Sequence, residues 1–200
     1  ADVAGKALLA AGAAGAVAAV GLGVASVKMA SDFQRGMAEV ATLFGPTKAE
    51  LDALSGGVLD LSAKLGTDAV ASTKALYQAI SAGVPSGNAL EFLEVASKAA
   101  IGGVTDTETA VNGLTTVMNA FREQNVTVEQ AADVMFATVK QGKTTFRELS
   151  DSMFNVAPIA AAAGVKFEEV SAAVATLTKS GVPTSVATTQ IRAAIQGLIK

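Results

Sequence analysis

The chain has 200 residues, half of them hydrophobic, and a formal net charge of −3 at pH 7. Its basic residues are scattered, which argues against a nucleic-acid-binding surface and any sequence-specific nucleic-acid partner. The lack of cysteine excludes disulfides and thiol catalysis, and the lack of histidine removes the most common general base and metal ligand. Because alanine and glycine supply much of the apolar content, we expect a core of small side chains between closely packed helices.

A segment without charged residues, Ala7 to Val27, comes first along the chain. Its 21 positions are enough to span a bilayer as a helix, although its glycines weaken a helix and its hydropathy is marginal. Three interpretations stay open: tight helix–helix packing or self-association, conditional membrane insertion, and a resident transmembrane helix. The packing interpretation depends on a stripe of small residues spaced four apart on one helical face, which comprises Ala7, Ala11, Gly15, Ala19 and Gly23.

The apolar pattern continues beyond this segment. Met29, Phe33, Met37, Val40 and Phe44 are spaced three or four apart and predict one apolar helical face, which Gly45-Pro46 should end. We therefore expect two units. Residues 1–45 would form a long Ala/Gly-rich apolar helix that packs or acts at a membrane, and residues 46–200 would form a module of helical hairpins.

Threonine followed three positions later by Glu or Gln predicts several helix starts, because the two side chains cap each other's backbone N–H groups. The four pairs are Thr47–Glu50, Thr105–Glu108, Thr127–Gln130 and Thr145–Glu148. In the first of these helices, the apolar residues spaced three and four apart favour a core-facing stripe over a coiled-coil seam. They are Leu51, Leu54, Val58, Leu61 and Leu65. Pro158 should kink or interrupt the helix that follows Thr145.

A helix–turn–helix pattern occurs twice, 98 positions apart, and organises the chain. Its turns are Gly83-Val84-Pro85 and Gly181-Val182-Pro183, and Gly66 recurs as Gly164 in the same register. In each copy we expect a helix to end at a glycine with positive φ, and Pro85 or Pro183 to prevent its continuation. Ser86, or Thr184 with Ser185, should cap the next helix. The whole pattern predicts an all-α fold of about eight helices in successive helical hairpins.

No group of residues predicts catalysis, and no cofactor-binding or metal-binding residue is predicted. Ser62 with Lys64, and Ser97 with Lys98, lack the spacing that brings side chains together on a helix, and we expect them on solvated faces. The remaining candidates are better explained as helix starts or as glycine-rich breaks without a phosphate-binding lysine. They are Glu168–Glu169, Asp106–Glu108, Gly21-Leu22-Gly23 and Gly102-Gly103.

The order of small and apolar positions over residues 29–200 resembles the core region of phage tail tape measure proteins of the TP901 type. The runs that carry the resemblance are 33–40, 79–83, Ala132-Asp133, 146–158, 164–182 and 187–194. The resemblance implies a virion structural protein without catalytic residues, which occupies the tail tube, sets tail length and leaves during DNA ejection. It implies further copies of the chain, tail tube proteins and tail-tip proteins as partners, with the host membrane as a further partner during ejection. The expected location is the tail lumen of the virion, and the host cytoplasm during assembly.

Two other functions remain as alternatives at this point. One is a membrane-active helical protein of the pore-forming or channel type, which would place the Ala/Gly-rich segment in a bilayer. The other is a helical-repeat adaptor that binds a soluble partner as a monomer. A ruler needs extended helix at about 1.5 Å per residue, yet this chain interrupts its helices every 15 to 20 residues. We therefore expect a folded helical module beside the ruler proper.

Overall fold

The computed structural model describes residues 27–199, and all regular structure within them is helical. This confirms the all-α class. A helix covers residues 27–41, and nine further α-helices follow it: α2 (Lys48–Leu65), α3 (Ala69–Ser81), α4 (Ala89–Gly102), α5 (Thr107–Ala120), α6 (Val128–Gln141), α7 (Phe146–Ser152), α8 (Ala157–Ala162), α9 (Phe167–Lys179) and α10 (Thr184–Leu198). Three short 3-10 helices, η1 (Ser86–Asn88), η2 (Arg122–Gln124) and η3 (Met153–Asn155), lie between them. The number of helices is close to the predicted eight.

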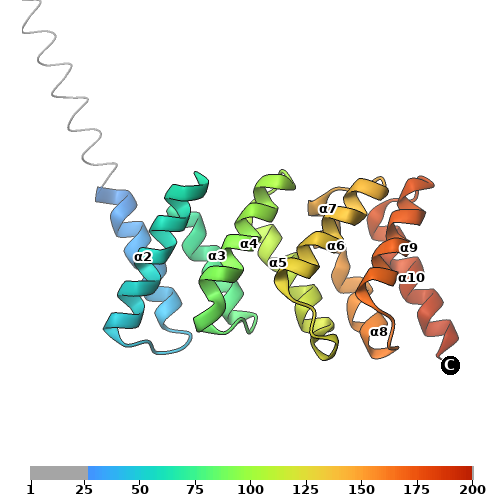
Figure 1. Cartoon of the computed structure of the whole chain (residues 1–200), viewed down its shortest axis with the longest axis horizontal. Coiled ribbons are helices and arrows are strands. Elements are labelled where there is room, and N and C mark those ends of the chain that lie inside the picture. Colours follow the sequence, from blue (N-terminus) through green and yellow to red (C-terminus); the bar gives the residue numbers. More distant parts are fainter. Residues whose placement is uncertain (1–26, 200) are drawn as a thin grey trace, which may run out of the picture.

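The helices follow one another along the long axis of the molecule in the order of the sequence (Figure 1). Most lie across that axis, and the first described residues and the C-terminus lie at opposite ends. The main packing partners of each helix are one to three helices away in the sequence, for example α3 with α5 and α6 with α9. The architecture is therefore a linear array of hairpins, in which each unit is stabilised by its neighbours.

Three of the four predicted capping boxes are present, at Thr47, Thr127 and Thr145. At the first, the Thr47 N–H donates to Glu50 Oε2 at 2.7 Å, and the Glu50 N–H donates to Thr47 Oγ1 at 3.3 Å. The prediction for Thr105 was wrong by one residue. Asp106 is the N-cap of α5, and its carboxylate accepts from the Thr109 N–H at 2.7 Å.

The two Gly-Val-Pro segments form the turns of two hairpins with the same backbone geometry. Gly83 ends the α3 side with φ 99°, and Gly181 ends the α9 side with φ 94°. Pro85 and Pro183 precede the next helices as N-cap residues. The expected hydroxyl caps are absent, because neither Ser86 nor Thr184 caps its helix with its side chain. The Thr184 hydroxyl instead donates to Thr144 Oγ1 at 2.7 Å, a contact between hairpins.

The 98-residue recurrence covers more of the chain in the structure than the matching residues of the two turns indicate. The capping box at Thr47 recurs at Thr145, and the left-handed Gly66 recurs as Gly164. Helix α3 has the same bounds as α9 after a shift of 98 positions, and α4 begins near the equivalent of the start of α10. Two copies of one helical unit therefore lie along the array, and helices α5 to α8 lie between the matching hairpins α3–α4 and α9–α10.

Pro158 interrupts its helix as predicted. Helix α7 stops at Ser152, η3 makes one tighter turn, and α8 restarts at Ala157 with Pro158 in its first turn, where a missing N–H has no cost. The helix over 27–41 ends three residues before Phe44, so the predicted end at Gly45 was too late, and Phe44 packs against the core from the following turn. Its Phe33, Met37 and Val40 are buried, but Met29 is 56% exposed.

One hydrophobic core runs the length of the array and contains many alanines. Phe121, Phe146 and Phe167 are its largest fully buried side chains. Phe121 at the end of α5 lies against Phe167 of α9, with ring centroids 5.3 Å apart, and Phe136 lies 5.0 Å from Phe146. The aromatic rings thus join helices of different hairpins, where the small residues alone would bury little area.

Replacing Val104 by glycine is expected to raise the free energy of unfolding by about 1 kcal/mol. Val104 lies just beyond α4 with φ 50°, a conformation that is strained for a β-branched side chain, and that side chain is 91% exposed. Glycine removes the strain without loss of packing, although its greater freedom in the unfolded chain opposes part of the gain. The urea-unfolding midpoint measures the change. An unchanged or lower midpoint would contradict the expected relief of strain.

Candidate functional site

The two serine–lysine pairs considered as nucleophiles are structural in the fold. Ser62 is buried in α2 and donates a hydrogen bond to Ser72 Oγ at 3.1 Å. Ser97 is buried in α4, and its hydroxyl oxygen has no hydrogen-bond partner among the described residues. The expectation of solvated faces was wrong for both serines, since these small polar side chains lie on packed helix faces.

The lysines of these pairs, Lys64 and Lys98, both contact the carboxylate of Glu94. Their Nζ atoms lie 2.9 and 2.8 Å from Glu94 Oε1. Hydrogen bonds and charge from Lys98 and Lys64 hold the pKa of the Glu94 carboxyl at about 2. The cluster joins α2 to α4 at the surface. A carboxylate between two lysines forms an ion-pair network and does not activate either serine as a nucleophile.

A second ionic contact joins α5 to α7. Arg147 Nη2 lies 2.6 Å from Asp106 Oδ2, and Arg147 Nη1 donates to Thr109 Oγ1 at 3.2 Å. Partial burial raises the pKa of the Asp106 carboxyl, but hydrogen bonds from Thr109 and Arg147 outweigh burial and lower the pKa to about 2. Asp106 is therefore both the cap of α5 and the acceptor that fixes α7 beside it.

Acidification is expected to destabilise the array between about pH 4.5 and pH 2. The folded-state pKa values of Glu94 and Asp106 lie below the ordinary values of 4.5 and 3.8. Their contribution to stability is therefore present above those ordinary values and is lost as the pH falls through the folded-state values. The effect should be small because both carboxyls are at the surface. Urea unfolding at a series of pH values measures it.

The matched variant for this measurement is Asp106→Asn. Asparagine can still cap α5, but it cannot titrate or form the ion pair with Arg147. The variant should lose part of the decline in the urea midpoint below pH 4. A decline identical to that of the unsubstituted chain would show that Asp106 does not contribute.

Neither a metal site nor a membrane span occurs within the described part of the chain. Residues 27–199 contain no group of three or more His, Cys, Asp or Glu side chains placed to hold a metal ion. Among the helices that the structure describes, none is both long and apolar enough to cross a membrane. The small-residue stripe Ala7, Ala11, Gly15, Ala19 and Gly23 lies outside the described residues, so neither finding applies to it.

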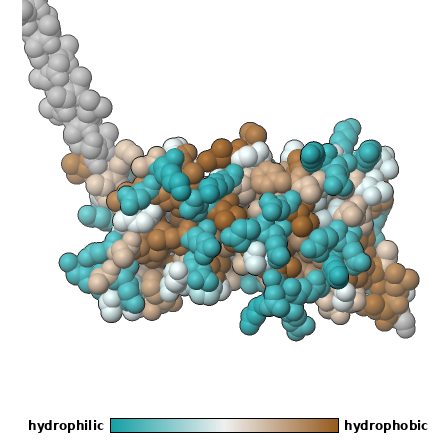
Figure 2. Space-filling view, viewed as in Figure 1, coloured by the Kyte–Doolittle hydropathy of each residue, from teal (hydrophilic) through white to brown (hydrophobic). Residues whose placement is uncertain are grey.

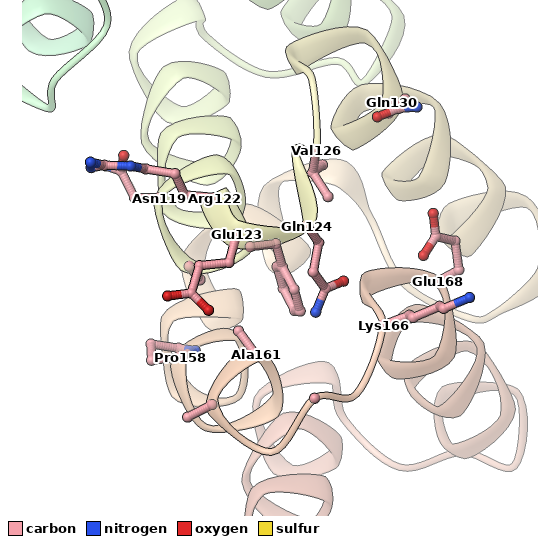
Figure 3. A pocket seen from close by; sticks show the side chains of 14 residues that line it. Asn119, Arg122, Glu123, Gln124, Val126, Gln130, Pro158, Ala161, Lys166 and Glu168 are labelled. Atoms are coloured by element: carbon pink, nitrogen blue, oxygen red, sulfur yellow. The ribbon is translucent and has the colours of Figure 1, made fainter.

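Two open hollows lie on either side of the loop that joins α5 to α6. The first, about 950 Å³, lies between the end of α5 and the α8–α9 turn (Figure 3). Gln124 Nε2 ties this loop to the Val165 carbonyl at 3.1 Å. Arg122 and Lys166 share the hollow with Glu123 and Glu168, so the charges balance and favour neither an anion nor a cation.

The second hollow, about 920 Å³, includes the Gly83-Val84-Pro85 turn. Asn119 Nδ2 donates to the Ala82 carbonyl at 2.9 Å and so connects α5 to this turn. The equivalent turn residues Gly181 and Pro183 lie near the C-terminal end of the array, between α9 and α10. The structure thus does not bring the four turn residues Gly83, Pro85, Gly181 and Pro183 together into one site.

An apolar groove of about 530 Å³ lies between the helix over 27–41 and α2. Met29, Phe33 and Met37 line one side, and Leu51 and Leu59 line the other. Met29 and Leu59 are 56% and 47% exposed. The spacing of these side chains predicts that they share helix faces. It does not predict the groove, because periodicity within a helix does not show which other helix covers that face.

The visible surface of the array alternates between hydrophilic and hydrophobic residues (Figure 2). Figure 2 shows hydrophilic residues in clusters, with hydrophobic surface between them and at the C-terminal end. Large exposed apolar residues occur at that end, including Val186, Leu198 and Ile199. The described residues therefore offer apolar surface for packing against other helices or proteins.

Comparison with known proteins finds similarity to phage tail proteins. The family model of the phage-related minor tail protein matches residues 55–200. A probable tape measure protein of Clostridium phage phiCD119 is 34% identical over 164 residues, which are 80% of this chain and 17% of that relative. A tape measure protein of Pneumococcus phage Dp-1 is 25% identical over 182 residues, 90% of this chain and 16% of that relative. The chain thus spans about one sixth of these relatives. No solved structure matches it significantly.

Proposed function

Since the chain belongs to the family of phage-related minor tail proteins, we propose that it is a segment of a tape measure that helps set tail length, assemble the tail and accompany DNA ejection. A structural role in the phage tail follows from the family. The finer role rests on one observation, namely that two curated tape measure proteins match 80% and 90% of the chain.

The proposed partners are further copies of the chain, tail tube proteins and tail-tip proteins, in the tail lumen of the virion and earlier in the host cytoplasm. The support is the surface just described, in which exposed apolar side chains at the ends of the array are suited to protein contacts. A non-enzymatic role belongs to the same proposal. Its support is that Ser62, Lys64 and Lys98 are held in structural contacts.

This segment acts as a folded module beside the ruler proper in our proposal. An uninterrupted helix of the 173 described residues would be about 260 Å long at 1.5 Å per residue. The array instead folds its helices across its long axis (Figure 1). We also propose that residues 1–45 and 46–200 are two parts of different role. Phe33, Met37 and Val40 of the first part nevertheless pack into the same core as α2.

The test uses the phage that encodes this chain. Quantitative mass spectrometry of purified virions should find its peptides at a few copies per tail, and their absence would overturn the tail function. A second phage carries an extra in-frame copy of residues 47–144, which is one full period of the recurrence. Electron microscopy should show tails that are longer by much less than about 150 Å, the length of 98 helical residues. Lengthening by about 150 Å would overturn the folded-module proposal and leave the tail role intact.

A further inference from the structure

The apolar groove at the start of the array has a counterpart in the second helical unit that is already filled. A shift of 98 positions places Leu51, Asp52, Ser55 and Leu59 of α2 on Leu149, Ser150, Met153 and Ala157. In α2 these positions line the groove and are partly or fully exposed. Their counterparts in α7, η3 and α8 are all buried, with at most 6% exposure.

Helix α5 covers the counterpart surface. It packs against α7, η3 and α8, and its contact is close enough that a Cβ on Gly113 would lie 2.6 Å from Ser150 Cβ. The other wall matches as well, because Phe33 and Met37 correspond to Ala131 and Met135 of α6, both fully buried. The same scaffold thus carries a covering helix in one unit and an open apolar groove in the other.

The same shift identifies the segment that corresponds to α5. Thr107–Ala120 corresponds to residues 9–22, which lie outside the described residues and within the charge-free stretch 7–27. Gly15 corresponds to Gly113. The segment is also attached at the right place, because the helix that forms one wall of the groove is described from residue 27 onward. Residues 23–26 are enough for a helix–helix connection of about two to five residues.

We propose that residues 9–22 dock as a helix in the groove of their own chain, in the position that α5 has in the second unit. Small side chains permit the close approach that Gly113 shows, and a segment without charge suits an apolar floor. Asp52 lies at the position of Ser150, so docking covers its carboxylate, which is already paired with the Lys48 Nζ at 3.7 Å. Docking buries the segment and the groove together. Self-association or membrane insertion of the segment then requires its release.

Engineered cysteines test the docked register, because the chain has no cysteine of its own. The pair Gly15→Cys with Asp52→Cys corresponds to Gly113 and Ser150 and should form an intramolecular disulfide on mild oxidation. The control is Gly15→Cys with Ala53→Cys, because Ala53 corresponds to Asp151, which is exposed on α7. The first pair should cross-link at least about tenfold faster than the control. Equal rates would overturn the docking, and disulfide-linked dimers would show exchange between copies and overturn docking within one chain.

Protection of the segment is a second measurement that needs no cysteine. Thermolysin cleaves beside large apolar residues, and residues 9–22 include Leu9, Val17, Val20 and Leu22. Leu59→Asp places a charge in the groove and should speed cleavage of this segment by roughly tenfold, with the helical circular dichroism unchanged. Val186→Asp, at a position of similar exposure in α10, should leave the cleavage rate unchanged. Cleavage as fast in the unsubstituted chain as in Leu59→Asp would overturn the proposal.

Discussion

Replacing Phe121 by alanine is expected to lower the free energy of unfolding by about 3–5 kcal/mol. Phe121 is fully buried at the end of α5, and its ring lies 5.3 Å from that of Phe167 in α9. The core to which it belongs contains many alanines and is spread over many helices, so it cannot close a cavity of phenyl size without moving whole elements. The loss should appear as a lower urea midpoint with an unchanged slope, because the amount of surface exposed on unfolding stays similar.

The matched control for this substitution is Phe154→Ala. Phe154 belongs to η3 and is 62% exposed, so its removal should change the free energy of unfolding by less than about 1 kcal/mol. Equal effects of the two substitutions would mean that the aromatic pair of Phe121 and Phe167 does not hold α5 against α9. Both variants lose one phenyl ring, so a difference between their free energies of unfolding reports the burial of the ring at Phe121.

Replacing Gly113 by alanine should destabilise the array by about 1–3 kcal/mol, although alanine favours a helix over glycine. A Cβ at this position would lie 2.4 Å from Ser150 Oγ and 2.8 Å from Ser150 Cα. The second of these is a backbone atom, so a change of rotamer cannot relieve the clash. Helices α5 and α7 would have to separate, which would weaken the packing within the second helical unit.

Gly56→Ala is the control, because Gly56 lies inside α2 and a Cβ added to it would meet no other atom within 4 Å. There the higher helix propensity of alanine should act alone and raise the free energy of unfolding by about 0.5–1 kcal/mol. The two glycine substitutions are therefore expected to have opposite signs in urea unfolding. The same sign for both would contradict the close packing of α5 on α7.

Local sequence signals predicted the helices well because their causes are local. The capping boxes at Thr47, Thr127 and Thr145 need only residues three positions apart, and the Gly83 and Gly181 turns need only a residue that tolerates positive φ. The error at Thr105 arose because Asp106 beside it is an equally good cap. The local pattern alone could not decide between the two neighbours.

Tertiary contacts explain what the sequence did not predict. Thr184 was expected to cap its own helix, but its hydroxyl bonds to Thr144, 40 positions away. Met29 has the periodicity of a buried residue and is nevertheless 56% exposed in the groove. The groove could be recognised only by comparison with Leu149 and Met153, which the fold places under α5. No spacing within one helix contains that information.

The open-ended row of hairpins has a mechanical consequence. Because each hairpin contacts mainly those next to it and the two ends lie at opposite extremes (Figure 1), tension applied to one end acts first on a single hairpin. The array can therefore unfold stepwise into an extended chain, and each step breaks only the contacts with the few helices that pack beside the one being pulled. Such a chain can be drawn through a conduit much narrower than its folded width.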